Sequence, residues 1–233
     1  MRVVSRGKTI IGRRDGLRSY INAVFAHMSL GLLLTAAISY LISTSPHLME
    51  ILFATPLRFV ILFAPLVIVL FFSARIHTLS KSTAIALFYT YATTIAISTS
   101  AIFMVYALPS IMNAFLTTSV LFGVMSIYGY VTQTDLTEMG SFLMMGLIGL
   151  IIASFINWFM QSSGLQYILS MIGALLFVGL TAYDTQRIKH MYYMISDEET
   201  RGKMAIFGAL VLYLDFINLF YMLLHLLGQR EKR

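Results

Sequence analysis

Residues 205–227 read AIFGALVLYLDFINLFYMLLHLL, a run of 23 residues in which Asp215 is the single carboxylate. A helix needs roughly 17 to 25 apolar residues to cross about 30 Å of hydrocarbon, so this run is long enough to span a membrane. An ionisable group at membrane depth is a functional candidate, because the bilayer offers no water to solvate its charge. The stretch therefore predicts a membrane-spanning helix that carries a functional carboxyl group.

The composition extends this prediction to the whole chain. Of the 233 residues, 58% are hydrophobic and 11% are charged, whereas a soluble domain has about 25% charged residues. The apolar runs are continuous, without the alternating polarity of β-barrel strands, so we predict an all-α polytopic membrane protein. One transmembrane domain, residues 19–227, lies between a basic segment at 1–18 and a polar tail at 228–233. The seven predicted spans are 19–42, 52–72, 83–106, 110–131, 141–160, 164–185 and 205–227.

Lysine and arginine residues in the short loops predict the orientation of the spans. Six basic residues precede the first span, and others follow the second and sixth spans, whereas loops near 43–51, 107–109 and 161–163 have none. This pattern places the N-terminus in the cytoplasm. The acidic loop at 132–140 and the basic tail fit less well, and six spans with one re-entrant segment would move the tail inside. We prefer seven spans, because each of the last two segments is long enough to cross.

A second carboxylate, Asp184, lies near the end of the sixth span in the sequence LTAYDTQR (180–187). Because the sixth and seventh spans are consecutive and antiparallel, Asp184 and Asp215 could approach within hydrogen-bonding distance. Two carboxyl groups at that range cannot both ionise cheaply, so they would share a proton and titrate as a unit, which is a pH sensor. Alternatively, Asp184 is solvated beside Arg187, and Asp215 bonds to a neighbouring helix. The residues alone leave both interpretations open.

Other polar residues in the predicted spans are weaker candidates. Arg58 lies about six residues into the second span, where its long side chain can reach the interface. His225 lies in the last span and could titrate near neutral pH, although an isolated histidine there more often bonds to a neighbouring helix. The chain has no cysteine, which excludes disulfides and thiolate metal sites. Its basic residues are too dispersed for a nucleic-acid surface.

Three segments carry a resemblance to a known family: YDTQRI at 183–188, LYLDFINLF at 212–220, and Asp135-Leu136 followed by GSFLMMGLIG at 140–149. They resemble the Bax inhibitor family of transmembrane proteins (TMBIM), and in particular its bacterial branch. The resemblance extends from about residue 17 to residue 227. It implies a seven-helix fold whose last helix is surrounded by the others, a bacterial inner-membrane location, and a pH-dependent calcium leak.

The resemblance also implies roles for individual residues. The paired aspartates of the family correspond to Asp184 and Asp215, and an arginine at the cytoplasmic end of the second helix corresponds to Arg75. An ion pair of Arg75 with the aspartates would act as a latch. The deprotonated pair would offer the hard oxygen ligands that Ca²⁺ prefers, with Ca²⁺ as the transported ion and no cofactor. Some relatives pair an acid in helix two with an arginine in the last helix. Here 52–72 contains no acid, and His225 stands near the arginine's place.

Two other function classes compete with the channel. A non-conducting scaffold would bind quality-control proteases or stress and death regulators in the membrane, and it leaves no recognisable motif. An intramembrane aspartyl protease also has two aspartates on consecutive helices, but it needs a glycine-rich GxGD around the second. Asp215 is preceded by Tyr213-Leu214, without that glycine. We therefore expect a pH-sensitive Ca²⁺ leak channel rather than an enzyme, with Ca²⁺, protons, lipid and possible membrane proteins as partners.

Overall fold

The computed structural model describes the backbone of residues 2–229 and the side chains of residues 15–229. The basic side chains at positions 2–14 and the tail at 230–233, which enter the predicted orientation, lie outside that part. In the described part, all the secondary-structure elements are helices. Its elements are α1 (Arg2–Ser43), α2 (Pro46–Ala54), α3 (Leu57–Arg75), α4 (Lys81–Thr99), the 3-10 helix η1 (Ser100–Met104), α5 (Leu108–Val131), α6 (Thr137–Met160), α7 (Ser163–Met194) and α8 (Glu198–Leu227).

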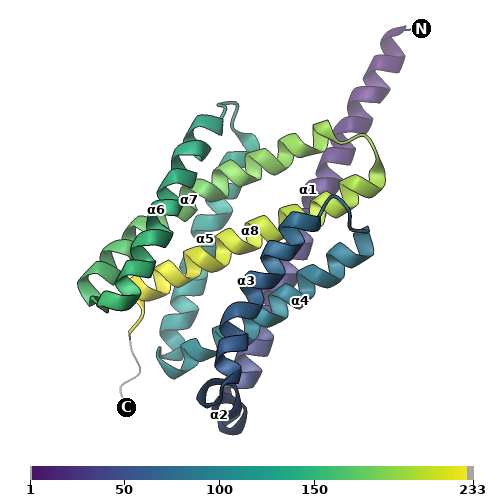
Figure 1. Cartoon of the computed structure of the whole chain (residues 1–233). Helices are drawn as coiled ribbons and strands as arrows, with labels where there is room; N and C mark the ends of the chain where they lie inside the picture. The colour runs from purple at the N-terminus through teal and green to yellow at the C-terminus, as the bar shows by residue number, and fades with distance from the viewer. Residues whose placement is uncertain (1, 230–233) are drawn as a thin grey trace. The chain divides into compact units, whose positions relative to one another are not determined.

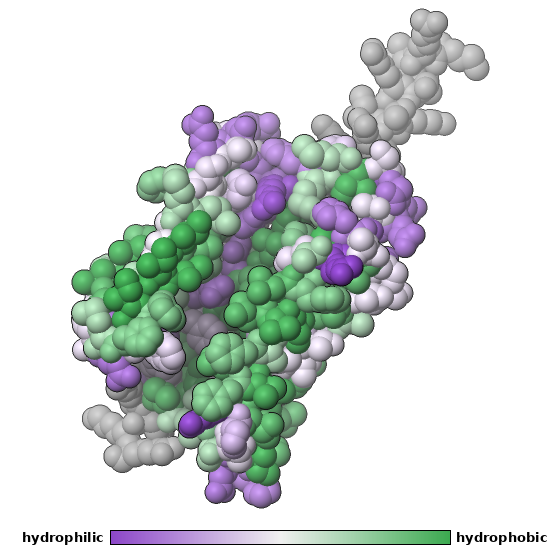
Figure 2. All heavy atoms as spheres, viewed as in Figure 1, coloured by the Kyte–Doolittle hydropathy of each residue, from purple (hydrophilic) through white to green (hydrophobic). Residues whose placement is uncertain are grey.

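Seven described segments are long and apolar enough to cross a membrane, which confirms the predicted number of spans. They are Asp15–Ser43 of α1, α3, α4 with η1, and the whole of α5, α6, α7 and α8. Many of their large apolar side chains are exposed, as on α6, where Phe142, Ile151 and Phe159 are each at least 60% accessible. Figure 2 shows hydrophobic side chains over this helix. Such a surface is suited to lipid, because lipid tails are as apolar as the side chains themselves.

The second span differs from its predicted boundaries. The apolar run was expected to form one helix over 52–72, but α2 ends at Ala54 and α3 begins at Leu57. The break lies at Thr55, whose backbone is extended (φ −97°, ψ 170°), directly before Pro56. A proline disfavours the helical conformation of the residue before it, which explains the interruption. The span itself is therefore α3, which contains Pro65 and ends at Arg75.

The chain divides into two compact units, and the first comprises residues 1–99 and 188–210. Its helices α1 and α4 lie side by side, with α3 against α4 (Figure 1). Small hydroxyl side chains join α1 to α4, because Ser39 Oγ donates to the carbonyl of Ala96 at 2.8 Å. His27 Nδ1 also lies 2.9 Å from the Tyr89 hydroxyl. This bond between neighbouring helices is the role expected for an isolated histidine in a membrane segment.

The second unit comprises residues 100–187 and 211–233. Its core is an apolar cluster contributed by α6, α7 and the second half of α8, with Leu143, Phe177 and Leu219 among its buried members. On another side of α8, Phe216 packs edge to face against Phe115 and Phe122 of α5, with ring centroids 5.5 Å apart in both pairs. The second half of α8 is thus enclosed by three helices of its own unit.

The last helix is the most buried of the seven spans. In its most apolar window 67% of the residues are buried, against 50% for α7 and 11% for α3 and α6. Residues 198–210 of α8 belong to the first unit and residues 211–227 to the second, so this helix contributes to both. The prediction of an enclosed last helix is confirmed.

Candidate functional site

Close contact between helices of the second unit fixes the position of α7 around Asp184. A side-chain carbon at Gly129 of α5 would collide with the backbone carbonyl of Ala182. A side-chain carbon at Gly140 of α6 would likewise collide with the ring of Tyr183. Small residues let membrane helices approach closely. Glycine at these two positions therefore allows α5 and α6 to lie directly against the turn of α7 that carries Asp184.

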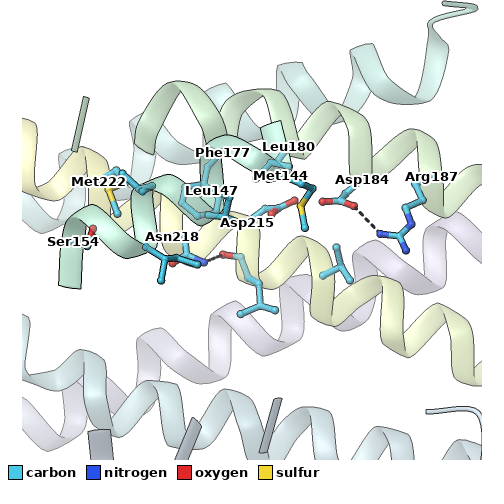
Figure 3. Close-up of a pocket in the computed structure, with 14 residues that line it drawn as sticks. Met144, Leu147, Ser154, Phe177, Leu180, Asp184, Arg187, Asp215, Asn218 and Met222 are labelled. Carbon is cyan, nitrogen blue, oxygen red and sulfur yellow. Dashed lines mark hydrogen bonds and ion pairs between the residues drawn. The ribbon is translucent and has the colours of Figure 1, made fainter. Parts of the chain in front are cut away.

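Asp184 and Asp215 lie together in this unit. Asp184 is 7% exposed and Asp215 is 5% exposed, and each carboxyl group lies near enough to the other to affect its ionisation. Figure 3 shows both pointing toward the same space, one from α7 and one from α8. Two neighbouring buried carboxyl groups cannot both ionise cheaply, so the geometry suits a pair that holds one proton.

The cation beside this pair is Arg187, one turn further along α7. Its Nη1 lies 3.9 Å from Oδ1 of Asp184, and its side chain is 57% exposed. At this distance the pair is weak, because water screens the exposed guanidinium group. The arrangement combines features of both sequence interpretations, since the carboxyl groups meet and Asp184 also lies beside Arg187. Among the described residues, Oδ2 of Asp215 is buried and has no hydrogen-bond partner.

The two carboxyl groups lie in the wall of a cavity of about 540 Å³ between α6, α7 and the second half of α8. Nine of the fourteen lining residues are apolar, so the polar groups are few and concentrated. The lining comprises Met144, Leu147, Leu150, Ile151, Ser154, Phe177, Leu180, Asp184, Arg187, Val211, Leu214, Asp215, Asn218 and Met222. A cavity between membrane helices with a pair of ionisable groups in its wall is a candidate ion or ligand site.

The cavity offers few oxygen ligands for a tightly held cation. Ca²⁺ takes six to eight oxygen ligands in a stable site, usually with several from protein. Among the described residues, no three His, Cys, Asp or Glu side chains gather closely enough to hold a metal ion. The pair offers hard carboxylate oxygens but no closed cage. A Ca²⁺ ion held by Asp184 and Asp215 would keep most of its water.

Two polar residues of this region were assigned no role from the sequence. Asn218 lines the cavity one turn after Asp215 and donates Nδ2 to the carbonyl of Leu214 at 2.8 Å. Gln186, which is 4% exposed, accepts from the Leu136 amide at 2.9 Å and donates to the Thr134 carbonyl at 2.8 Å. Gln186 lies two residues after Asp184, and its two hydrogen bonds hold the loop between α5 and α6 against α7. The YDTQ motif contained this glutamine, but only the fold shows its partners.

Comparison with known proteins identifies the family. The profile of the family described as "Inhibitor of apoptosis-promoting Bax1" matches residues 17–232. The chain belongs to the Bax inhibitor family. The inner membrane protein YbhL of Escherichia coli K12 is 42% identical to it over 229 residues, covering 97% of this chain and 98% of YbhL. An uncharacterized protein of Rickettsia prowazekii is 44% identical over 217 residues, covering 93% of this chain and 92% of its own length.

A more distant member of the Bax inhibitor family, an uncharacterized membrane protein of Streptococcus pyogenes, is 32% identical over 93% of this chain and 95% of its own length. The family and the seven apolar helices together make this chain an integral membrane protein. The names of the Escherichia coli and Streptococcus pyogenes relatives give a membrane location, and the activity has to be argued from the site.

The other candidates from the sequence of this Bax inhibitor family member are Arg75, Arg58 and His225. Arg75 is exposed at the end of α3, in the first unit. Arg58 is exposed near the start of α3, with its guanidinium 5.0 Å from the Phe59 ring centroid, which suits an interfacial anchor. His225 Nδ1 lies 2.7 Å from the Tyr221 carbonyl of its own helix. Its hydrogen bond therefore stays within α8. Its ring also contacts that of Tyr106.

Proposed function

We propose that this protein is a pH-sensitive Ca²⁺ leak channel of a bacterial inner membrane, with its N-terminus in the cytoplasm. The observation that carries the proposal is the placement of Asp184 and Asp215 together, buried, in the wall of a cavity between three membrane-spanning helices. Ionisable groups at membrane depth mark ion and proton paths, because their burial is expensive unless it serves a function. Both residues act as the proton sensor and as the ion site.

A proton on the pair has two opposite effects. It removes charge from the ligands of Ca²⁺, which weakens ion binding at low pH. It also weakens attraction to a nearby arginine, which we propose to be Arg75, so it releases the latch. With two protons the ion site is lost, and with none the latch is closed. The channel therefore conducts best when the pair holds one proton, which gives a bell-shaped dependence on pH.

The test is Ca²⁺ flux into proteoliposomes of the purified protein, with an indicator dye trapped inside, from about pH 5 to about pH 8, where a coupled pair of this kind can titrate. We expect flux above that of protein-free vesicles, with a maximum inside this range. A matched vesicle preparation containing an unrelated membrane protein controls for leakage at reconstitution defects. Flux no greater than in these controls at every pH would overturn the channel proposal.

The latch makes a separate prediction. Replacing Arg75 with glutamine removes the charge that closes the path against the fully ionised pair, so flux should stay high at the alkaline end. We expect an increase there of about tenfold, the size of a coupling of about 1–3 kcal/mol. Arg187→Gln is the matched comparison, because Arg187 contacts Asp184 directly. If Arg187→Gln alone removes the alkaline decline, Arg187 is the latch and the assignment to Arg75 is wrong.

We further propose that the carboxyl pair does not serve catalysis. An intramembrane aspartyl protease needs a flexible glycine-rich backbone at its second aspartate. Asp215 instead lies inside the continuous helix α8, between Leu214 and Phe216. The Phe216 ring packs against two rings of α5, which holds this turn of the helix in place.

A further inference from the structure

The cavity beside the carboxyl pair has more apolar wall than a small hydrated ion requires. Its volume of about 540 Å³ falls inside the range of about 300 to 1,000 Å³ typical of small-molecule sites. Met144 and Ile151 of α6 line it and are themselves 45% and 60% exposed. These residues belong to the apolar surface of a membrane-spanning helix. The cavity thus borders the face that lipid covers, and an amphiphile could enter it sideways from the membrane.

One carboxylate oxygen beside the cavity, Oδ2 of Asp215, lacks a hydrogen-bond partner among the described residues. Arg187 lies beside Oδ1 of Asp184, whereas Oδ2 of Asp215 is fully buried and accepts no hydrogen bond from any described residue. Buried polar groups are almost always hydrogen-bonded, so such an orphan needs an explanation. The side chain of Asp215 points into the cavity (Figure 3). A ligand with a positively charged hydrogen-bond donor would complement the two carboxyl groups that line the cavity.

We propose that this cavity binds a single-chain amphiphile with a protonated amine. The ammonium group, which has three donors, binds the carboxyl pair where Asp184 and Asp215 line the cavity. The hydrocarbon chain lies along the apolar wall of α6 toward Ser154. An anionic amphiphile would be repelled by the two carboxyl groups, and a sugar would leave its hydroxyls against apolar side chains. Binding does not depend on conduction, but in a conducting channel the amine would occupy the ion's place and block flux.

The probes are octylamine, octanol and octanoate, which share a chain length and differ in the charge and hydrogen bonding of the head group. The protein is purified in a non-ionic detergent, and its melting temperature is measured with each probe at equal concentration. A ligand that binds the folded state raises the melting temperature with its concentration. We expect a rise with octylamine that octanol and octanoate do not produce. An equal rise with octanol would overturn the role of the amine.

Two variants locate the site, each with a matched control. Asp215→Asn should remove the octylamine effect, whereas Asp197→Asn, at an exposed carboxylate, should retain it. Ser154→Phe should also remove the effect by filling the far end of the cavity. Ser141→Phe, on an exposed part of the same helix that does not line the cavity, should retain it. If Asp215→Asn fails to fold, the comparison of Ser154→Phe with Ser141→Phe still tests the site. An octylamine effect that survives Ser154→Phe overturns the proposal.

The amine site and the channel can fail separately. An octylamine-specific rise in a protein that shows no Ca²⁺ flux would leave the amine site standing and overturn the channel. Flux with the expected pH maximum, together with no octylamine-specific rise, would overturn the amine site and leave the channel standing.

Discussion

Replacing Asp215 with asparagine is expected to abolish the pH maximum of Ca²⁺ flux. Asparagine keeps the size and one oxygen of the aspartate but carries no charge and does not titrate in this range. The remaining carboxylate, Asp184, then has no partner with which to share a proton. Since the bell-shaped profile arises from the two protonation steps of the pair, one step and one limb of the profile are lost. Asp184→Asn should have the same effect for the same reason.

The double variant tests whether Asp184 and Asp215 act as a unit. Groups that act as a unit are not additive, with interaction energies of about 0.5–3 kcal/mol between contacting residues. The double Asp184→Asn/Asp215→Asn variant should therefore conduct about as well as the worse single variant. The control is Asp197→Asn. The Thr200 amide donates to Asp197 and lowers the pKa of this exposed carboxyl group, so it stays ionised across the tested range. A pH maximum that survives in both single variants would contradict the sensor assignment.

Gly129→Ala should produce a large loss of stability. The added carbon would meet the backbone carbonyl of Ala182, which cannot rotate away as a side chain can. Either α5 or α7 must shift, and overpacking of this kind costs about 1–3 kcal/mol or more. Alanine favours a helix by about 1 kcal/mol over glycine, which offsets only part of that cost. Because Ala182 lies two residues before Asp184, the shift should also disturb the carboxyl pair.

Gly123→Ala provides the matched control on the same helix. A side-chain carbon there meets nothing within 4 Å, so this variant should be as stable as the native chain or more stable by up to about 1 kcal/mol. The measurement is unfolding in mixed micelles with increasing SDS, followed by the loss of helical circular dichroism. Equal midpoints for the two variants would show that α5 and α7 do not approach as closely as the structure has them.

The sequence predicted the membrane fold well, because span length and hydropathy depend only on local composition. It failed where a local backbone preference interrupted an apolar run, as at Thr55 before Pro56, which the hydropathy of 52–72 does not reveal. The 3-10 helix Ser100–Met104 inside the predicted third span is a similar case. No residue there is charged, so composition gives no warning of the change in helix type.

The carboxyl pair was also predictable in part. Consecutive antiparallel helices brought Asp184 and Asp215 together as a hypothesis, and the family resemblance favoured it. The cation beside Asp184 was also predicted, because one of the two interpretations placed Asp184 beside Arg187, one helical turn away. The cavity lining was beyond prediction. It depends on which faces of α6, α7 and α8 meet, and these apolar helices have no strong sequence periodicity to indicate their faces.

The hydrogen bonds of Gln186 have a consequence for how this protein tolerates change over evolution. The glutamine hydrogen-bonds to main-chain atoms of residues 134 and 136. These bonds depend on the backbone conformation of the loop and not on its side chains. Substitutions at exposed loop positions such as Gln133 leave both bonds intact. An insertion or deletion between 132 and 136 would break them. We therefore expect relatives to hold the length of this loop constant while varying exposed positions such as Gln133.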